Sequence, residues 1–252
     1  PAGAAGTYNG GDGTAEHPYE IDNATQLISL SQHSEDWGLC FVLTNDIDMD
    51  PNVTGIPAFT TALIAPATDS SGWGEFEGDA FIGIFNGNRH IIRNLRINTP
   101  DTANSYLGLF GKITGPNAVI KNLGLQNAYI IGGNDSGFFG GLCGWNYGGM
   151  ISSCYSSGLI TGEAIVGGLC GSNDGGIITN CYTIGTISGM GTLGGLCGIN
   201  QNGEIENCFA TGSIHGFDPN SLTTIIPYDG GGLCGENREG SITNCYATSL
   251  VT

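Results

Sequence analysis

The stretch GGLCGSNDGGIITNCY, residues 167–182, occurs four times along the chain in nearly the same letters. The copies begin at Gly140, Gly167, Gly194 and Gly231, so the successive steps are 27, 27 and 37 residues. Each copy holds two cysteines eleven positions apart. A repeat of this length, built from strand-like segments punctuated by glycine, is typical of a solenoid.

Two looser copies precede the strict ones and carry apolar residues in both cysteine columns. Phe85 and Phe110 align with the first cysteine, and Leu95 and Leu123 align with the second. Because large apolar side chains are usually buried, both columns are predicted to face a core.

A straight strand cannot bury every apolar residue of the repeat, because neighbouring side chains point to opposite faces. Leu169 and Cys170 are such neighbours. If the strand stays straight there, the leucines form an outward stripe, whereas a bend at the glycine pair turns them inward, and we favour the bend. The leucine column consists of Leu109, Leu142, Leu169, Leu196 and Leu233.

A second bend is expected just before the second cysteine, where asparagine recurs and tolerates the left-handed backbone of a corner. The corner column consists of Asn94, Asn122, Asn180, Asn207 and Asn244, with Ser153 as the exception. We expect these amides to form a hydrogen-bonded ladder from coil to coil. A second column follows each GGLCG segment, at Asn146, Asn173, Asn200 and Asn237. Two rows of corners predict an all-β fold, a right-handed parallel β-helix or solenoid, in which each coil covers its neighbour.

The chain divides into an arm and one domain. Residues 1–19 are rich in Gly and Ala and are predicted to form an extended N-terminal arm. Asn23 and Gln26 make a capping box ahead of Leu27 and Leu30, which predicts a short N-terminal capping helix. Residues 20–252 are expected to form a single β-helix domain, with strict repeats over 140–252 and an insertion loop over 216–230.

Composition limits the partners and the compartment. Six Lys+Arg against 23 Asp+Glu give a net charge of −17, which argues against nucleic acid or an anionic membrane as a partner. The sequence has no apolar run long enough for a membrane span. The chain starts at Pro1 in PAGAAG, which looks like a mature end left after removal of a signal peptide. Nine cysteines favour an oxidising compartment, so we expect an extracellular or cell-surface protein.

The strict repeat GGLCGxNxGGxIxxCY resembles the GLUG motif of bacterial secreted and surface proteins, whose usual form is close to GGLVGxNxGxIxNCYxxGxV. Two upstream stretches, HPYEIDNATQLISLSQHSEDWGLCFVLTNDIDMD and FIGIFNGNRHIIRNLRI, resemble the segment that commonly precedes such repeats. The resemblance covers nearly all of residues 17–252. It implies a parallel β-helix and no particular activity, since the motif occurs in adhesin-like and other surface proteins without marking an active site. Where the family usually has Val, all four strict repeats here have Cys.

Two interpretations of the cysteines remain open. They are either small buried hydrophobic residues that form rows of free thiols, or disulfides closed within each coil, which we favour because both cysteines occur together in every strict copy. The predicted bridges are Cys143–Cys154, Cys170–Cys181, Cys197–Cys208 and Cys234–Cys245. Cys40 is then a buried free thiol. Zinc is not expected, because the chain lacks a CxxC spacing and its histidines (His17, His33, His90 and His215) lie outside the cysteine pairs.

Two charged clusters are candidates for a metal-binding or catalytic site. Asp46, Asp48 and Asp50 share one strand face and carry the oxygens that Ca²⁺ prefers, but they lack the glycine turn and distal Glu of a calcium loop. Arg89, Arg93, Arg96 and His90 cluster on one coil, as in β-helices that cleave acidic polysaccharides, yet NGNRHIIRN resembles the family's common GNGHxIxN. We therefore assign no catalytic, cofactor or metal residues.

Three functions follow, and we favour the first. It is a non-enzymatic structural subunit of an extracellular assembly, such as a filament, tube or surface layer, built by head-to-tail self-association of β-helices. The arm would complete a neighbour's last coil, and lateral contacts would come from Leu222, Ile225, Ile226 and Tyr228. The alternatives are an adhesin or surface-glycan-binding module, for which Trp37, Trp73 and Trp145 are too scattered to form a groove, and a polysaccharide lyase or hydrolase.

Overall fold

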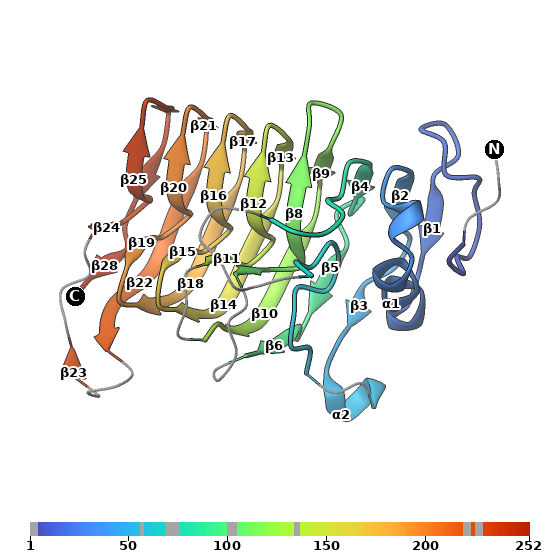
Figure 1. The fold of residues 1–252 in the computed structure, drawn as a ribbon, viewed down its shortest axis with the longest axis horizontal. Coiled ribbons are helices and arrows are strands. Elements are labelled where there is room, and N and C mark those ends of the chain that lie inside the picture. Colours follow the sequence, from blue (N-terminus) through green and yellow to red (C-terminus); the bar gives the residue numbers. More distant parts are fainter. Residues whose placement is uncertain are drawn as a thin grey trace.

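The computed structural model describes residues 5–55, 58–68, 76–99, 105–133, 137–218, 223–224 and 229–252. The chain winds into coils that stack along one long axis, with β1 at one end and β25 at the other (Figure 1). Corresponding strands of successive coils lie side by side and pair in parallel, for example β14 with β18 and β16 with β20. The predicted all-β parallel β-helix is confirmed.

Two long sheets run through the stack. The eight-stranded sheet contains β1 (Tyr19–Ile21), β2 (Cys40–Leu43), β4 (Ile84–Asn86), β9 (Val119–Lys121), β13 (Met150–Ser152), β17 (Ile177–Thr179), β21 (Glu204–Glu206) and β26 (Ser241–Thr243). The ten-stranded sheet contains β3 (Ile47–Asp48), β5 (Ile91–Arg93), β6 (Arg96–Asn98), β10 (Gly124–Ile131), β14 (Tyr155–Gly162), β18 (Tyr182–Gly189), β22 (Phe209–Asp218), β23 (Thr223–Thr224), β27 (Tyr246–Ala247) and β28 (Leu250–Val251).

Two five-stranded sheets complete the coils. The first contains β7 (Tyr106–Leu107), β11 (Phe138–Gly140), β15 (Ile165–Gly167), β19 (Thr192–Gly194) and β24 (Asp229–Gly231). The second, which we call the cysteine sheet, contains β8 (Phe110–Thr114), β12 (Cys143–Tyr147), β16 (Cys170–Asp174), β20 (Cys197–Gln201) and β25 (Cys234–Arg238).

The expected bend before the second cysteine is present in every repeat. The backbone φ is +55° at Asn180 and +54° at Asn207, and the exceptional Ser153 adopts the same conformation with φ +54°. This left-handed residue turns the chain from the eight-stranded into the ten-stranded sheet, so that Ile178 and Cys181 both point into the core.

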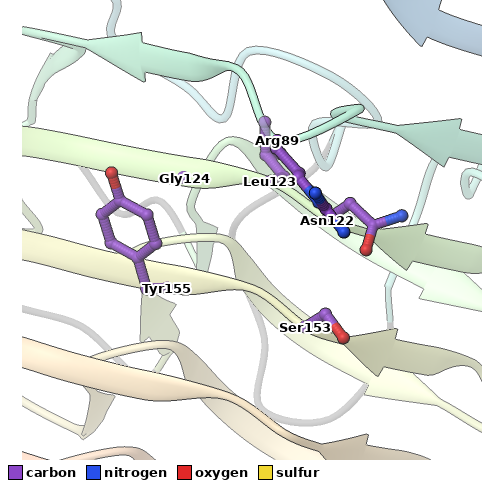
Figure 2. Close-up of a pocket in the computed structure, with 6 residues that line it drawn as sticks. All are labelled: Arg89, Asn122, Leu123, Gly124, Ser153 and Tyr155. Atoms are coloured by element: carbon purple, nitrogen blue, oxygen red, sulfur yellow. The ribbon is translucent and has the colours of Figure 1, made fainter.

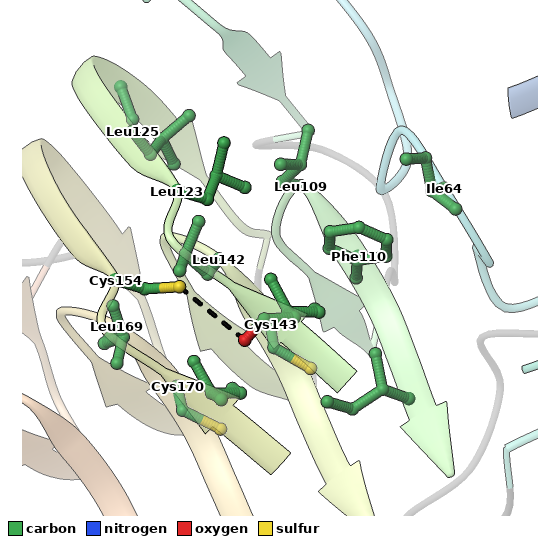
Figure 3. Packing of buried hydrophobic residues seen from close by; sticks show 14 of the residues in the cluster. Ile64, Leu109, Phe110, Leu123, Leu125, Leu142, Cys143, Cys154, Leu169 and Cys170 are labelled. Atoms are coloured by element: carbon green, nitrogen blue, oxygen red, sulfur yellow. Dashed lines mark hydrogen bonds between the residues drawn. The ribbon is translucent and has the colours of Figure 1, made fainter. Parts of the chain in front are cut away.

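The bend at the glycine pair is also present, and it buries the leucine column. Leu142 and Leu169 have no exposed surface, and neither do their neighbours Cys143 and Cys170. Figure 3 shows these side chains packed together in the interior of the stack. Leu233, in the last coil, is only partly buried against the same core.

The capping helix is confirmed as α1 (Ala24–Gln32), which buries Leu27 and Leu30. Asn23 Oδ1 accepts a hydrogen bond from the Gln26 amide at 3.0 Å, while Gln26 Oε1 accepts from Asp22 N rather than from Asn23 N. A 3₁₀ turn, η1 (Ser34–Asp36), follows α1. A second helix that was not predicted, α2 (Pro51–Thr54), is a single turn capped by Asp50 with Pro at its start.

The described part of the N-terminal arm lies on its own first coil. Asn9 N donates to Glu20 O at 2.9 Å, and the Tyr8 ring stacks on Tyr19 with 4.9 Å between centroids. Tyr8 Oη and Gly6 N both donate to the buried Asp36 carboxylate, each at 2.8 Å. Residues 5–13 therefore cover the N-terminal end of the stack, and the first strand begins at Tyr19, within the predicted arm.

The 37-residue step leaves the coil register unchanged. Before the extra residues, Gly216 of β22 pairs with Gly189, and after them Asp229 of β24 pairs with Thr192. The extra length thus leaves the coil after β22 and returns at β24. The predicted lateral residues Leu222, Ile225, Ile226 and Tyr228 lie outside the described residues.

Candidate functional site

The cysteines form two rows that run along the stack. In the cysteine sheet, Cys143 is in register with Cys170, Cys170 with Cys197, and Cys197 with Cys234. In the second row, the amide of each residue points at the sulfur of the next coil, with Cys154 N to Cys181 Sγ and Cys181 N to Cys208 Sγ both 3.4 Å. Each cysteine thus has its counterpart in the neighbouring coil beside it.

The predicted within-coil disulfides are not formed in the structure, which holds all nine cysteines as free thiols. The missing bridges are Cys143–Cys154, Cys170–Cys181, Cys197–Cys208 and Cys234–Cys245. The sulfurs are directed elsewhere: Cys170 Sγ donates to Ser172 O at 3.1 Å, and Cys181 Sγ donates to Thr179 O at 3.2 Å. Cys40 is a half-buried rather than a fully buried thiol.

Burial determines the chemistry of these thiols. Desolvation raises the pKa of both Cys143 and Cys181 well above the usual value for cysteine. Cys143 and Cys181, protonated and enclosed, are therefore poor nucleophiles and poor metal ligands. The rows therefore act as core packing, as Phe110 and Leu123 do in the same columns upstream. The expected alignment of Phe85 with the first cysteine is wrong, because Phe85 pairs with Ile120 in the eight-stranded sheet, and Leu95 likewise lies outside the second column.

The amide ladder lies in the second asparagine column rather than in the corner column. Asn146 Nδ2 donates to Asn173 Oδ1 at 2.7 Å, Asn173 to Asn200 at 2.7 Å, and Asn200 to Asn237 at 2.8 Å. The first three of these residues have no exposed surface. In the corner column, the Asn180 amide bonds within its own coil, to the Thr179 hydroxyl at 3.2 Å. Asn94 and Asn122 bond across coils but not to each other: Asn127 Nδ2 donates to Asn94 Oδ1 at 2.7 Å, and Asn122 Nδ2 donates to Asn86 Oδ1 at 3.1 Å.

The ladder explains the second glycine of the motif's GG pair. Asn173 Nδ2 also donates to Gly176 O at 3.0 Å, which ties the amide to the turn that follows β16. A Cβ atom on Gly176 would lie 2.2 Å from Asn146 Nδ2 and 2.6 Å from Asn173 Oδ1. Only glycine leaves room for two stacked amides at this position.

The aspartate cluster fastens β3 to the next coil. Asp46 Oδ1 lies 3.1 Å from His90 Nδ1 and accepts from Ile91 N at 3.1 Å. Asp48 accepts from Arg93 Nε at 3.1 Å and from Asn94 Nδ2 at 2.7 Å. These contacts lower the pKa of both carboxyls, mainly through the Ile91 amide for Asp46 and the Asn94 amide for Asp48.

The third aspartate, Asp50, caps α2 by accepting from Asn52 N at 2.9 Å. Among the residues that the structure describes, no group of three or more His, Cys, Asp or Glu side chains is placed to hold a metal ion. Of the basic residues on this coil, Arg93 is paired with Asp48, and the Arg96 guanidinium lies 5.4 Å from the centre of the Tyr129 ring.

An aromatic row, which the sequence analysis missed, runs along the outside of the ten-stranded sheet. Tyr155, Tyr182, Phe209 and Tyr246 stack with ring centroids 5.0, 4.9 and 5.2 Å apart and with nearly parallel planes. The signal was available in the repeat, because each of these residues directly follows the second cysteine. The tryptophans do not join this row: Trp37 is buried, Trp145 stacks on Tyr106 across the coils, and Trp73 lies outside the described residues.

The aromatic row ends at a pocket of about 290 Å³ on the surface of the β-helix. Arg89, Asn122, Leu123, Gly124, Ser153 and Tyr155 line it (Figure 2). Arg89 comes from the turn between β4 and β5, Asn122 and Ser153 are corner residues of successive coils, and Tyr155 begins β14. No carboxylate belongs to this lining.

The last described coil has an uncovered outer side. Ile205 of β21 has no exposed surface, whereas Ile242, its register partner in β26, is 36% exposed. Tyr246, Leu250 and Val251 are exposed large apolar residues of the same coil. At this end the core columns, the amide ladder and the aromatic row all reach the surface.

No helix among the described residues has both the length and the apolar character needed to cross a membrane.

Comparison with solved structures supports the β-helical architecture. The chain matches a structure named IgA1 Protease with a TM-score of 0.52 at 19% identity, over 92% of this chain and 19% of that one. At this identity the similarity concerns the fold alone.

Two relatives match by sequence. Halomucin of Haloquadratum walsbyi is 33% identical over 162 residues, which is 61% of this chain and 2% of that protein. A putative Gly-rich membrane protein of Evansella cellulosilytica is 35% identical over 143 residues, which is 56% of this chain and 15% of that protein. The chain thus corresponds to a small part of each.

The family described as the GLUG motif matches three segments, residues 162–188, 191–214 and 227–252. Each segment contains one second-row cysteine and its following aromatic residue, at Cys181, Cys208 and Cys245. The chain therefore carries three GLUG-motif repeats within residues 162–252, and they form coils of a parallel β-helix.

Proposed function

We propose that this protein is a non-enzymatic structural element of an extracellular or cell-surface assembly, in which β-helical coils stack end to end. The observation that carries the proposal is the set of side-chain rows that pass from coil to coil and reach the outer side of residues 229–252. A further coil with the same columns would continue the Asn237 ladder and the Tyr246 stack, and it would cover Ile242.

The arrangement at the N-terminal end changes how such stacking would occur. Head-to-tail addition through an exchanged arm requires residues 1–14 to leave their own molecule. Residues 5–13 instead contact Asp36, Tyr19 and Glu20 of the first coil. The proposal therefore assigns the stacking contact to the side of residues 229–252 that faces away from β20 and β21, and its occupant is a further β-helical coil with the same columns.

A non-enzymatic role is supported by how the charged side chains are used. A glycoside hydrolase generally needs a pair of carboxyl groups, and the pocket lining contains none. Desolvation raises the pKa of Tyr155 above its ordinary value. Its phenol therefore stays protonated near neutral pH and cannot act as a general base there. Asp46 and Asp48 are engaged by His90, Arg93, Asn94 and backbone amides.

An extracellular or cell-surface location is supported by the names of the two relatives, Halomucin and a putative Gly-rich membrane protein. The net charge of −17 fits a protein that stays solvated outside the cell and has no affinity for nucleic acid.

The test is self-association measured by sedimentation velocity and electron microscopy over a range of protein and salt concentrations. Copies with a charge of −17 repel one another, so salt that screens this repulsion should promote association. The variant Ile242→Lys places a charge on the outer side of the last coil and should abolish association.

The matched control is Ile184→Lys, which makes the same substitution at a side chain that is 52% exposed on the flank of β18. This control should associate like the unaltered protein. Monomers in all preparations and at all salt concentrations would reject self-stacking, and equal loss in both variants would show that added charge alone, rather than the last coil, governs association.

A further inference from the structure

The pocket lies where the outer aromatic row is interrupted. Gly124 of β10 is in register with Tyr155 and has no side chain to continue the row. A Cβ atom on Gly124 would lie 2.5 Å from Tyr155 Cζ, so the tyrosine ring rests directly over this glycine. The pocket therefore has an aromatic wall at one end and opens beside the corners that carry Asn122 and Ser153 (Figure 2).

Arg89 forms a cationic wall of the pocket from a strained position. Its φ is +69° and that of Asn88 is +50°, in the left-handed region that glycine and asparagine adopt far more readily than arginine. Arg89 N donates to Asn122 O at 2.8 Å, which holds the turn against the pocket. The same left-handed conformation recurs at the corner residues Asn122 and Ser153, and Arg89 lies beside them on the pocket.

Arg89 differs from the other arginines in its contacts. Arg93 is paired with Asp48, Arg96 lies against the Tyr129 ring, and Arg238 Nη2 donates to Glu236 at 2.7 Å. Among the described residues Arg89 has neither a carboxylate nor an aromatic partner, and it lines a pocket.

The local charge also favours an anion more than the overall charge suggests. Five of the six basic residues fall between positions 89 and 121. Asp46 acts electrostatically on Tyr155 but is itself held by His90 and the Ile91 amide. The pocket lining contributes no negative charge of its own.

We propose that this pocket binds a carboxylate-bearing sugar, a hexuronic acid unit of an acidic polysaccharide. The Arg89 guanidinium would pair with the sugar carboxylate, since its planar fork matches carboxylate geometry. Tyr155, whose ring stacks on Tyr182 and lies over Gly124, would contact the sugar with its ring edge and hydroxyl. The Asn122 amide oxygen and the Ser153 hydroxyl would hydrogen-bond the ring hydroxyls, because Asn122 Nδ2 is already engaged by Asn86 Oδ1 at 3.1 Å.

This inference goes beyond the proposed structural role and is independent of it. It assigns the pocket to binding and not to cleavage, so the ligand should be recovered unchanged after incubation. A monomeric protein that binds the sugar, or an assembling protein that does not, would separate the two proposals.

The test measures binding of an oligogalacturonate by isothermal titration calorimetry at fixed, near-physiological salt, with a neutral galactose oligomer of equal length as the comparison. The variant Arg89→Gly removes the guanidinium and suits the left-handed backbone, so it should fold. Loss of a charge-assisted hydrogen bond should weaken binding at least about 10-fold. The matched control Arg238→Gln removes the same charge on a distant coil and should bind within about 2-fold of the unaltered protein.

A second variant, Tyr155→Leu, tests the aromatic wall and should weaken binding several-fold, by about 0.5–1.5 kcal/mol converted to affinity. The proposal is overturned if the oligogalacturonate fails to bind at about 10 mM, well above the range of a useful site. It is also overturned if the neutral oligomer binds equally well, or if Arg238→Gln loses as much affinity as Arg89→Gly. Appearance of unsaturated sugar products would replace binding with lyase activity.

Discussion

Replacing Asn173 by alanine tests whether the internal amide ladder holds the coils together. Asn173 is fully buried and takes part in three side-chain hydrogen bonds. Its Nδ2 donates to Gly176 O at 3.0 Å and to Asn200 Oδ1 at 2.7 Å, and its Oδ1 accepts from Asn146 Nδ2 at 2.7 Å. Alanine removes all three bonds and leaves three buried polar groups without these partners.

The size of the effect follows from the cost of those groups. Each buried donor or acceptor left without a partner costs about 1–3 kcal/mol. Asn146 Nδ2 keeps its bond to Gly149 O, and Gly176 O keeps its bond from Glu204 N, so Asn200 Oδ1 is the group that loses its amide partner outright. One orphaned acceptor at about 1–3 kcal/mol and two lost bonds at about 0.5–1.5 kcal/mol each lead us to expect Asn173→Ala to lower the free energy of unfolding by about 2–6 kcal/mol. Because a domain is usually stable by only about 5–15 kcal/mol, this loss should be plain in urea denaturation followed by circular dichroism.

The matched control is Asn180→Gly in the same repeat. Asn180 is an exposed corner residue with φ +55°, and its amide makes one bond, to the Thr179 hydroxyl at 3.2 Å. Glycine adopts this conformation without strain, so the free energy of unfolding should change by less than about 1 kcal/mol. A loss below about 1 kcal/mol for Asn173→Ala, or an equal loss for both variants, would refute the argument that the buried ladder is the stronger element.

Three further predictions can be checked on the same protein. Protein denatured without reductant should show nine titratable thiols if the rows are free, whereas a single thiol would restore the within-coil bridges. The folded-state pKa of Asp48 is lowered, so its contribution to stability is present above the unfolded pKa of about 3.9 and is lost as the pH falls through the folded pKa. Asp48→Asn should therefore flatten the acid side of a stability profile, and an unchanged profile would count against this role. Deleting residues 218–227 leaves two residues between Gly216 and Asp229, as between Gly189 and Thr192, so folding should persist while any lateral association weakens; a variant that fails to fold would place the insertion in the core.

Much of the fold was predictable because a solenoid repeats one set of contacts. The column that contains Phe110 and Cys143 had to face the core, since both an aromatic residue and a cysteine occupy it, and the structure places these two residues in register. The corner at Asn180 was predictable for a different reason: a buried Ile178 and a buried Cys181 cannot share a straight strand. Periodicity and strand geometry together were enough for both features.

The contacts within and between coils could not be separated by periodicity. Cys170 is eleven positions from Cys181 and 27 positions from Cys197, and either spacing can bring two cysteines together in a β-helix. The structure puts Cys170 in register with Cys197, because the stack aligns equivalent residues of successive coils. The same ambiguity led us to expect the amide ladder at the exposed corner, while burial strengthens the hydrogen bonds of the inner column at Asn173.

The pocket illustrates why a functional site is harder to predict in a repeat protein than a core. Its lining comes from places where the repeat is broken: Gly124 interrupts the aromatic row, Ser153 replaces a corner asparagine, and Arg89 occupies a left-handed turn position. A pattern search favours what recurs, and these three residues do not recur. The rows give the molecule a regular scaffold, so the deviations from the rows are where a surface with its own chemistry can form. Mutagenesis of the β-helix should therefore begin at Arg89 and only then turn to the repeated columns.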